Sequence, residues 1–386
     1  MNSCKIDNKM AKADIFQTVT SITYWVDAFQ AASEVSRLLS GLREKGKIMA
    51  TILEVAKLAG VSKATVSRVL SGNGYVSQET REKVMQAVAE TEFRPNLLAR
   101  NLSVKSTQTI GLVVTNTLYS GNYFSELMSH SARMLEQQGR QLILADGKHS
   151  AAQERAAIDF LLDLRCDGII IYPRFLTIDE MDEIIAQHKQ PVLVVNRRLR
   201  QHHSFCIYAD QKRISAMAVQ SLIDLGHRDI AFITGSLDSP TGLERLAGYK
   251  AALEESGIPL REALIAQGNW HAESGAQATS ALLASNCAFS ALVASNDEMA
   301  IGAIRALTTA QIAVPTQVSV LGFDDIPLAP FTVPALSSVK IPVTEMIQEA
   351  IARLLAMLDG GSWQDAHAFA ASLSLRESVA PGPFAR

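Results

Sequence analysis

Apolar residues early in the chain recur every three or four positions, a spacing that predicts three short helices. Thr51 and Glu54 have the form of a capping box at the start of the first helix, and Ser62 can cap the second. Ser77 can cap a third helix over residues 78–90. The residues expected to face a common core are Ile52, Val55, Ala56, Ala59, Val66, Val69, Leu70, Val84, Ala87 and Val88.

The second predicted helix carries polar or small residues on its other face. Gly60 allows a tight turn before it, which completes the pattern of a helix-turn-helix unit. A face of this composition can enter the major groove of DNA without collision. An ordinary helical hairpin would show the same spacing. The residues expected to read DNA in and around this helix are Ser62, Lys63, Ala64, Thr65, Ser67, Arg68 and Asn73.

The stretch RPNLLARNLS, residues 94–103, follows as a second candidate for DNA contact. Pro95 suits the start of a helix, but a seven-residue helix is marginal alone in water, so its leucines need a partner. An apolar wedge flanked by basic residues suits a kinked minor groove. A linker with a few leucines is the simpler alternative. The expected contacts here are Asn96, Ala99, Arg100 and Leu102.

After residue 108 the pattern changes to short apolar runs, most of them separated by helix-like segments. Continuous runs of Ile, Val and Leu between helices are typical of parallel strands that helices cover on both faces. Ten strands would make one sheet unusually wide, so two sheets are expected. The predicted strands span residues 109–116, 141–147, 167–173, 191–197, 205–210, 228–236, 263–270, 290–297, 318–325 and 337–342.

Polar residues stand at the carboxyl ends of these strands, where ligands bind in open α/β sheets. Amides, carboxylates and a guanidinium can pair with hydroxyl groups, and an aromatic face packs on the C–H surface of a sugar. Alternatively, each Asp or Asn caps the next helix. The strand ends hold Thr115, Asn116, Asp146, Asn196, Arg197, Asp210, Asn269, Trp270, Asn296, Asp297, Asp324 and Asp325, while Tyr123 and Phe124 open the first helix of this region and Arg245 opens a later one.

The run VSKATVSRVLSGNGYVS followed by RPNLLARNL resembles the DNA-binding headpiece and hinge of the LacI/GalR family of bacterial repressors. The resemblance continues through SALVASNDEMAIGA and VSVLGFDD, and it covers nearly everything after Thr51. It implies a small all-helical headpiece on an α/β body with parallel sheets, similar to periplasmic binding proteins, in which three crossovers join two lobes. The positions that match the family's effector cleft are Thr115, Phe124, Asn196, Arg197, Arg245, Trp270, Asn296 and Asp324.

Two departures from the family pattern affect the expected sites. The stretch TLYSGNYF has an extra residue beside the usual loop, so Tyr123 joins Phe124 as a candidate for the cleft wall. Ala64 carries no hydrogen-bonding group, which reduces base readout at that position of the recognition helix to a methyl contact.

The expected domains follow from these patterns. The segment 1–48 fits neither the headpiece nor the body, and Met49 is expected to be the true start. Family headpieces begin near Met49, and Glu, Lys, Gly and Arg in GLREKGKI have purine-rich codons, as a ribosome-binding site before a start codon would have. The other expected boundaries are 49–94 for the headpiece, 95–108 for the hinge helix and linker, 109–386 for the effector-binding body, about 109–209 with 343–365 for the first lobe, and about 210–339 with 366–386 for the second.

The net charge of −3 is unevenly distributed. Residues 49–108 hold eight Lys or Arg against five Asp or Glu, and residues 1–48 hold seven against five, which leaves −8 on the rest of the chain. A basic headpiece on an acidic body places the charge that attracts phosphate where the short helices lie.

Several classes of protein are excluded by what the sequence lacks. Four widely spaced cysteines without a Cys/His cluster fit a reducing cytosol and suggest no metal site, and no apolar run reaches 18 residues. The motifs GxSxG, HExxH and GxGxxG are absent, and GLREKGKI has Ile48 where a P-loop needs Ser or Thr for Mg²⁺. We therefore expect a cytoplasmic protein without enzymatic activity, metal or cofactor.

The sequence thus predicts a repressor whose affinity for a double-stranded, pseudo-palindromic DNA operator is controlled by a small sugar or glycoside. Two headpieces on such an operator imply at least a homodimer, with a tetramer left open. Alternatives are a regulator that responds to another sugar or a purine-type ligand, or a sugar-binding protein that does not bind DNA. The stretches NTLY, NRR and APFTVPALSSVKIPVTEMIQE carry a narrower likeness to family members that control β-glucoside operons.

Overall fold

The computed structural model describes residues 50–72, 74–93, 106–115, 122–285, 287–361 and 368–385. The chain divides into two compact units, residues 1–100 and 101–386, and the division falls inside the segment expected to be the hinge.

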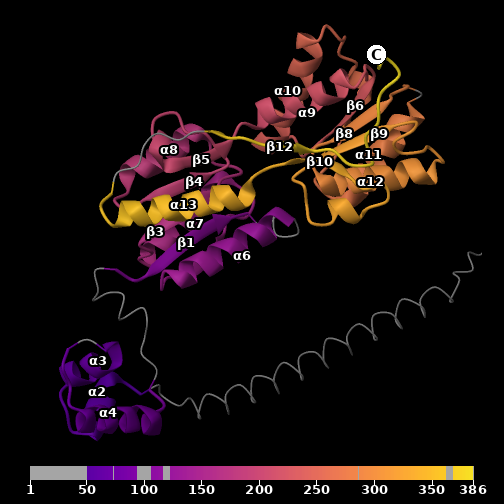
Figure 1. The fold of residues 1–386 in the computed structure, drawn as a ribbon. Helices are drawn as coiled ribbons and strands as arrows, with labels where there is room; N and C mark the ends of the chain where they lie inside the picture. The colour runs from indigo at the N-terminus through magenta and orange to yellow at the C-terminus, as the bar shows by residue number, and fades with distance from the viewer. Residues whose placement is uncertain are drawn as a thin grey trace, which may run out of the picture. The chain divides into compact units, whose positions relative to one another are not determined.

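The described part of the headpiece contains three helices, α2 (Ile52–Ala59), α3 (Lys63–Ser71) and α4 (Gln78–Thr91) (Figure 1). Val55, Val66 and Val84, one from each helix, have no exposed surface and meet in a single apolar cluster. The other residues expected in this core are buried or partly buried in the same cluster, so the predicted inner faces of the three helices are confirmed.

The expected capping side chains hold the helix starts. The Glu54 carboxylate accepts the backbone N–H of Thr51 at 2.6 Å, and Ser62 Oγ accepts the N–H of Thr65 at 3.1 Å. Gly60 ends α2 with φ of +64°, a left-handed conformation that glycine adopts at little cost. Each cap satisfies an N–H that the helix itself cannot, and a cap of this kind contributes typically about 1 kcal/mol.

Within the described residues, the body contains two six-stranded sheets, in the orders β11-β5-β4-β3-β1-β2 and β12-β10-β9-β8-β6-β7. Every pairing is parallel except that of β10 with β12. The strands are β1 (Thr109–Val114), β2 (Gln141–Asp146), β3 (Gly168–Tyr172), β4 (Val192–Val195), β5 (Cys206–Ala209), β6 (Ile230–Thr234), β7 (Ile265–Gln267), β8 (Ala291–Ala294), β9 (Ser319–Phe323), β10 (Ser337–Lys340), β11 (Ala368–Phe369) and β12 (Ser372–Ser374).

Helices alternate with these strands along the body. They are α6 (Asn122–Gln137), α7 (Ala151–Asp163), α8 (Ile178–Gln187), α9 (Gln211–Asp224), α10 (Pro240–Glu255), α11 (Ala272–Ala284), α12 (Asp297–Thr309) and α13 (Val343–Leu358), with single 3₁₀ turns at η2 (His203–Phe205), η3 (Glu262–Leu264) and η4 (Ala329–Phe331).

Helices cover both faces of each sheet, which is why the strands read as continuous apolar runs. In the first sheet, Leu112 and Val114 pack with α6 and α13, whereas Val113 packs with α7 and α8 on the other face. In the second sheet, Phe232 packs with α9 and α10, whereas Ile233 packs with α11 and α12. The predicted α/β class with two parallel sheets is confirmed.

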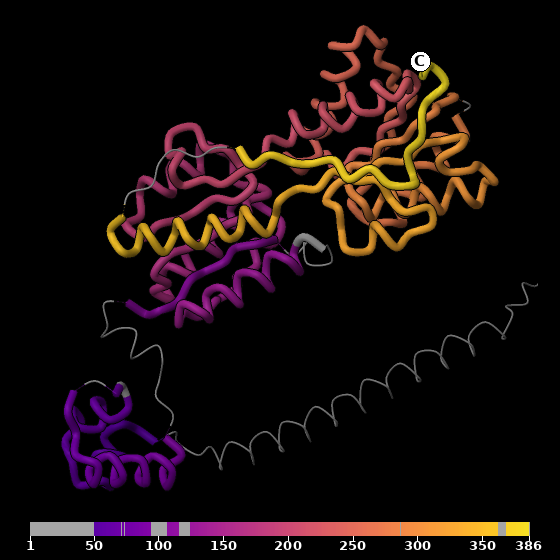
Figure 2. The backbone as a smooth tube through the Cα atoms, in the orientation of Figure 1, coloured from indigo at the N-terminus to yellow at the C-terminus, as the bar shows by residue number. Residues whose placement is uncertain are grey.

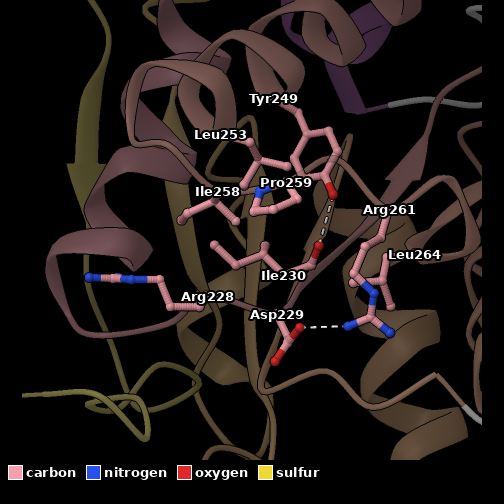
Figure 3. A pocket seen from close by; sticks show the side chains of 9 residues that line it. All are labelled: Arg228, Asp229, Ile230, Tyr249, Leu253, Ile258, Pro259, Arg261 and Leu264. Atoms are coloured by element: carbon pink, nitrogen blue, oxygen red, sulfur yellow. Dashed lines mark hydrogen bonds and ion pairs between the residues drawn. The ribbon is translucent and has the colours of Figure 1, made fainter.

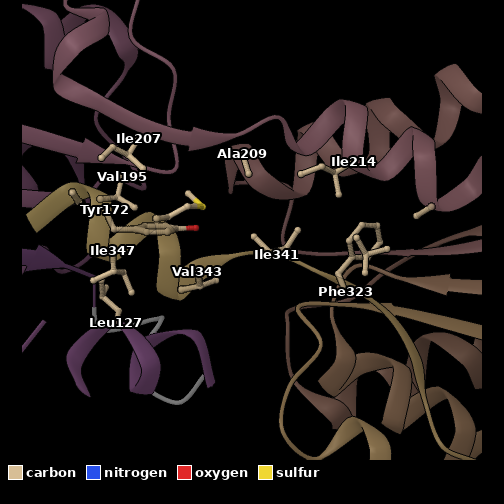
Figure 4. Close-up of a cluster of buried hydrophobic side chains, with 14 of the residues drawn as sticks. Leu127, Tyr172, Val195, Ile207, Ala209, Ile214, Phe323, Ile341, Val343 and Ile347 are labelled. Carbon is tan, nitrogen blue, oxygen red and sulfur yellow. The ribbon is translucent and has the colours of Figure 1, made fainter. Parts of the chain in front are cut away.

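The largest apolar cluster extends through both lobes (Figure 4). The chain crosses between the two sheets three times, from β5 to α9, from β10 to α13 and from β11 to β12 (Figure 2). Ile341, on the second crossover, lies between the apolar side chains of the two lobes. The lobes therefore share buried surface at the crossovers.

All ten predicted strands are present, and three details differ from expectation. Ala368 and Phe369 form β11, which pairs with β5 and so extends the first sheet, although this part of the chain was assigned to the second lobe. Arg245 does not open a helix: α10 begins at Pro240, because proline suits the first helical position. The short strands β11 and β12 are not among the ten predicted strands.

His227 fastens the C-terminal stretch to the second sheet. Its ring is 2% exposed, with Nδ1 at 2.9 Å from Ser290 Oγ and Nε2 at 3.0 Å from the backbone oxygen of Ala380. A carbonyl oxygen can only accept, so Nε2 carries the hydrogen and Nδ1 accepts from the serine. Burial lowers the pKa of His227 below its usual value of 6.5, and the bond to Ala380 opposes this only in part.

We predict that His227 makes the body less stable in mild acid. Below pH 6.5 the unfolded chain binds a proton on this ring before the folded chain does, so the free energy of unfolding falls as the pH falls toward the lowered folded pKa. Urea unfolding of the wild type and of His227→Gln, from pH 7.5 down to 5.5, measures this. The variant should lose this part of the pH dependence, whereas equal slopes for the two proteins would contradict the assignment.

Candidate DNA interface and effector site

The outer face of α3 is exposed as the DNA-reading hypothesis requires. Ser62, Lys63, Ala64, Ser67 and Arg68 are exposed and Thr65 is half-buried, while the intervening valines face the core. The Cδ atom of Arg68 lies 3.7 Å from the position that a Cβ would take on Gly74, which places the arginine stem beside the turn after α3. The exposed face thus combines two cations with small polar groups.

The remaining candidates for DNA contact are Asn73, Asn96, Ala99, Arg100 and Leu102, and they lie outside the described residues. Their roles stay predictions.

In the body, side chains from both lobes form a chain of hydrogen bonds at the strand ends. Asn196, after β4, donates through Nδ2 to Tyr172 Oη at 2.5 Å and to Thr241 Oγ1 at 3.2 Å. Its Oδ1 accepts from Gln211 Nε2 at 3.1 Å. Gln211 Oε1 in turn accepts from Arg245 Nε at 2.9 Å. We call Tyr172, Asn196, Gln211, Arg245 and Asp324 the strand-end relay.

Arg245 is the cation of this relay, and it is almost fully enclosed, with 4% of its surface exposed. It forms an ion pair with Asp324 at 3.1 Å, donates to the backbone oxygen of Ser295, and lies 4.5 Å above the Phe323 ring. The Asp324 side chain keeps 26% exposure, so one side of this pair remains open to solvent. Arg245 and Asp324, two predicted effector contacts, therefore lie together.

The beginning of α6 lies close to this pair. Burial raises the pKa of Glu126, on the first turns of α6, and the charge of Asp324 raises it further. An electrostatic effect of this kind requires proximity. Phe124 is half-buried near the same helix start, and the Tyr123 side chain lies outside the described residues. Thr115 is fully buried at the end of β1.

Trp270 and Asn296 form a second pair in the second lobe. Asn296 caps α12 by accepting the Met299 N–H at 2.9 Å, and its Nδ2 donates to the backbone oxygen of Trp270 at 2.7 Å. Asn296 therefore fulfils the capping role that was its alternative interpretation, and it also fixes the loop that carries Trp270. The indole lies against Gly235, where an added Cβ would come within 2.1 Å of Cζ2.

Arg197 is buried beside carboxylates. Its Nη1 donates to the backbone oxygen of Asn196 at 2.7 Å, and it is 8% exposed. Burial raises the pKa of Glu244 on α10, while the charge of Arg197 acts in the opposite direction. The guanidinium thus lies close to a carboxylate of the second lobe.

Asp297, another of the polar strand-end residues, has a structural role. It is fully buried, accepts from Ser338 Oγ at 2.6 Å and accepts the Ile326 N–H at 2.9 Å. Burial raises its pKa well above the usual value, and Asp324 adds to this. Asp210 likewise caps α9 through the Arg213 N–H at 2.9 Å.

Sequence reasoning missed Tyr172, Gln211 and Thr241, which hold the predicted site residues in place. It also missed Glu154, whose buried carboxylate accepts the backbone N–H groups of Arg174, Phe175 and Leu176 at 2.8, 3.0 and 2.8 Å. Arg174 then forms an ion pair with Asp238 of the second lobe at 2.9 Å. The only sequence signal for Gln211 is its place directly after the polar strand end Asp210.

A cavity of about 230 Å³ lies elsewhere in the second lobe (Figure 3). Ile230, the first residue of β6, is part of its lining, so the cavity lies at the amino end of the sheet. Tyr249 donates to the Ile230 backbone oxygen at 2.9 Å, and Arg261 pairs with Asp229 at 2.6 Å. This cavity is separate from the strand-end relay.

No group of three His, Cys, Asp or Glu among the described residues could hold a metal ion. None of the described helices is both long and apolar enough to cross a membrane.

Comparisons with known proteins match both units. The model for bacterial regulatory proteins of the lacI family matches residues 51–96, and a periplasmic binding protein-like domain matches residues 219–379. The HTH-type transcriptional regulator AscG of Escherichia coli (strain K12) is 65% identical over 331 residues, which are 86% of this chain and 98% of that protein.

Two solved structures show the same architecture. The Lac repressor dimer bound to operator and the anti-inducer ONPF has a TM-score of 0.75 at 29% identity, covering 86% of this chain and 99% of that one. The complex of the transcriptional regulator CelR with cellobiose has a TM-score of 0.63 at 29% identity, covering 85% and 99%.

A helix-turn-helix headpiece joined to a two-lobed body of parallel sheets defines a class of ligand-responsive bacterial transcription regulators. The chain belongs to the LacI family of that class. It is a DNA-binding, sugar-responsive transcriptional repressor and not an enzyme.

We predict that Gly235→Ala displaces the Trp270 indole, because the added methyl group would occupy the position of Cζ2. The emission maximum of tryptophan fluorescence should shift. Trp270→Phe identifies the Trp270 contribution among the three tryptophans of the chain. Gly257→Ala is the control for a loss of stability alone: its φ of +64° makes an alanine there strained, but no atom lies within 4 Å of the added Cβ, so the indole is not touched. Unchanged emission in the folded Gly235→Ala chain would show that the indole does not lie against Gly235.

Proposed function

We propose that the chain represses a β-glucoside utilisation operon by binding its operator through α3, and that a β-glucoside bound at the strand-end relay controls this binding. The observation that carries the proposal is the Arg245–Asp324 pair, at 4% and 26% side-chain exposure, with the Phe323 ring against the guanidinium. A fork of donors next to a carboxylate can pair with neighbouring hydroxyl groups of a hexose.

The relatives support the class of ligand. CelR, of similar fold, was solved with cellobiose, a glucoside with a β linkage. The stretches NTLY, NRR and APFTVPALSSVKIPVTEMIQE resemble those of family members that control β-glucoside operons. A regulator for another sugar or for a purine-type ligand is the alternative, and a panel of ligands distinguishes them.

The DNA side of the proposal requires two copies of the chain. The Lac repressor relative is a dimer on its operator, and two symmetric headpieces match the two halves of a pseudo-palindrome. We infer that this chain acts as a homodimer in the cytoplasm, where the bacterial chromosome lies. The linker between headpiece and body carries the signal.

The mechanism follows from the crossovers. A ligand that binds side chains of both lobes favours one angle between them, and the first lobe holds β1, which directly follows the linker. A change of that angle moves the two linkers of a dimer relative to each other and changes operator affinity. Couplings of this kind are typically about 1–3 kcal/mol.

We predict that Arg68 contributes to operator selectivity. Arg68→Ala should weaken binding to a duplex selected by the full chain from random DNA by roughly 1–3 kcal/mol, and should weaken binding to unselected DNA less. Lys83→Ala is the control, because Lys83 forms an exposed ion pair with Glu79 on α4. Mobility shifts at one salt concentration measure both affinities. Equal weakening on both duplexes would make Arg68 a phosphate contact only.

The direct test of the proposed site is a separation of functions. Arg245→Ala and Asp324→Ala should each weaken the response to the active β-glucoside by about one to two decades in concentration, because a charged hydrogen-bonding partner contributes about 1.5–3 kcal/mol. Operator binding without sugar should stay within about threefold of wild type, since neither residue belongs to the headpiece.

The matched control is Arg261→Ala, which breaks an Arg–Asp pair of the same lobe at the far end of the sheet. It should leave the sugar response unchanged. Wild-type sugar response in both relay variants would place the ligand elsewhere. Loss of operator binding by both folded variants would mean that the two sites are not separable.

A further inference from the structure

We propose that Gln211 is a positioning residue that joins the ligand-binding side chains of the two lobes, so that the lobes respond to ligand as one unit. This inference deepens the proposed function and rests on it for the identity of the ligand. It assigns the coupling to one neutral, buried side chain.

The position of Gln211 suits this role. It is the first residue of α9, directly after the first crossover, and it is 2% exposed. Its amide bonds to a first-lobe residue on one side, Asn196, and to a second-lobe residue on the other, Arg245. Asn196 follows a strand of the first sheet, and Arg245 lies on α10, which covers the second.

The direction of the hydrogen bonds explains why an amide occupies this position. Arg245 Nε can only donate, so it needs an acceptor, which Gln211 Oε1 provides at 2.9 Å. Asn196 Oδ1 can only accept, so it needs a donor, which Gln211 Nε2 provides at 3.1 Å. A glutamine side chain carries one donor group and one acceptor on the same carbon, so it satisfies both neighbours at once.

Among the described bonds, Asn196 meets the Arg245 guanidinium only through Gln211, although its bond to Thr241 joins it directly to α10, the helix that carries Arg245. Its Nδ2 already donates to Tyr172 and Thr241. The Tyr172 hydroxyl points from the first lobe toward the second (Figure 4). A ligand that shifts Arg245 or Asp324 therefore acts on Asn196 and Tyr172 through Gln211. Buried hydrogen bonds transmit such shifts well, because an unpaired buried group is costly.

Two substitutions separate this role from simple packing. Gln211→Leu has a similar volume but removes donor and acceptor together. Gln211→Glu keeps an acceptor for Arg245, and the Asn196 amide can turn over to donate to it while the Tyr172 and Thr241 hydroxyls donate to Asn196. If volume alone mattered, leucine would serve as well as glutamate. Gln220→Leu is the matched control, because Gln220 lies on the same helix and also joins two neighbours, donating to Asp224 at 2.8 Å and accepting from Ser256 at 3.1 Å, but both neighbours belong to the second lobe.

The first measurement needs no ligand. Amide hydrogen exchange of residues 192–199 in the full chain reports on the first lobe after a change in the second. Arg245→Ala should speed this exchange at least threefold in the wild-type, Gln211→Glu and Gln220→Leu backgrounds. In the Gln211→Leu background, Arg245→Ala should speed the exchange of these residues by less than a further 1.5-fold. Equal acceleration in the Gln211→Leu and wild-type backgrounds would overturn the proposal, whatever the ligand is.

The second measurement uses salicin, arbutin and cellobiose as probes. In Gln211→Leu, the change in operator affinity at saturating sugar should fall to less than a third of the wild-type change, while sugar still binds. An unchanged operator response at saturation would overturn the coupling role. If wild type ignores all three sugars while the exchange result holds, the β-glucoside assignment fails and the relay stands.

Discussion

The buried guanidinium of Arg245 is the constraint on which the ligand-binding part of the body depends. Arginine keeps its charge at any ordinary pH, so burying it at 4% exposure requires partners on every side. Gln211, the Ser295 backbone oxygen and Asp324 accept its N–H groups, and the Phe323 ring covers one face. These partners come from α9 and from the ends of β8 and β9, so one cation fixes the relative positions of three elements.

The headpiece and the body bind different kinds of partner, and each uses a different kind of residue to do so. The headpiece is small, and its three capped helices leave a basic and polar face exposed for a polyanion. The body is large enough to bury a polar relay between two apolar layers, so its ligand can be recognised by hydrogen bonds at low solvent exposure. The repressor needs both, because operator binding requires exposed charge whereas discrimination among sugars requires enclosed partners.

The sequence predicts the parts of this structure that rest on periodicity. Buried parallel strands appear as apolar runs, and all ten strands predicted from such runs are present. The caps at Thr51, Ser62 and Ser77 were predicted as well. The two-residue strand β11 has no pattern to show. Gln211 and Thr241 were missed because their partners lie 15 and 45 positions away, and such bonds leave no periodic trace. Asp324 was marked by its place at a predicted strand end, and the family resemblance assigned both Asp324 and Arg245 to the effector cleft.

The most direct test of the central claim is the operator affinity of the wild-type chain in the presence of a ligand panel. A duplex selected from random DNA is titrated with protein alone, with salicin, arbutin or cellobiose, with the α-glucoside maltose, and with a purine base. At least one β-glucoside should change the dissociation constant by about 5- to 150-fold, the range of typical allosteric couplings. Maltose and the purine should leave it unchanged. A response to the purine or to maltose alone, or to none of the five, would contradict the account.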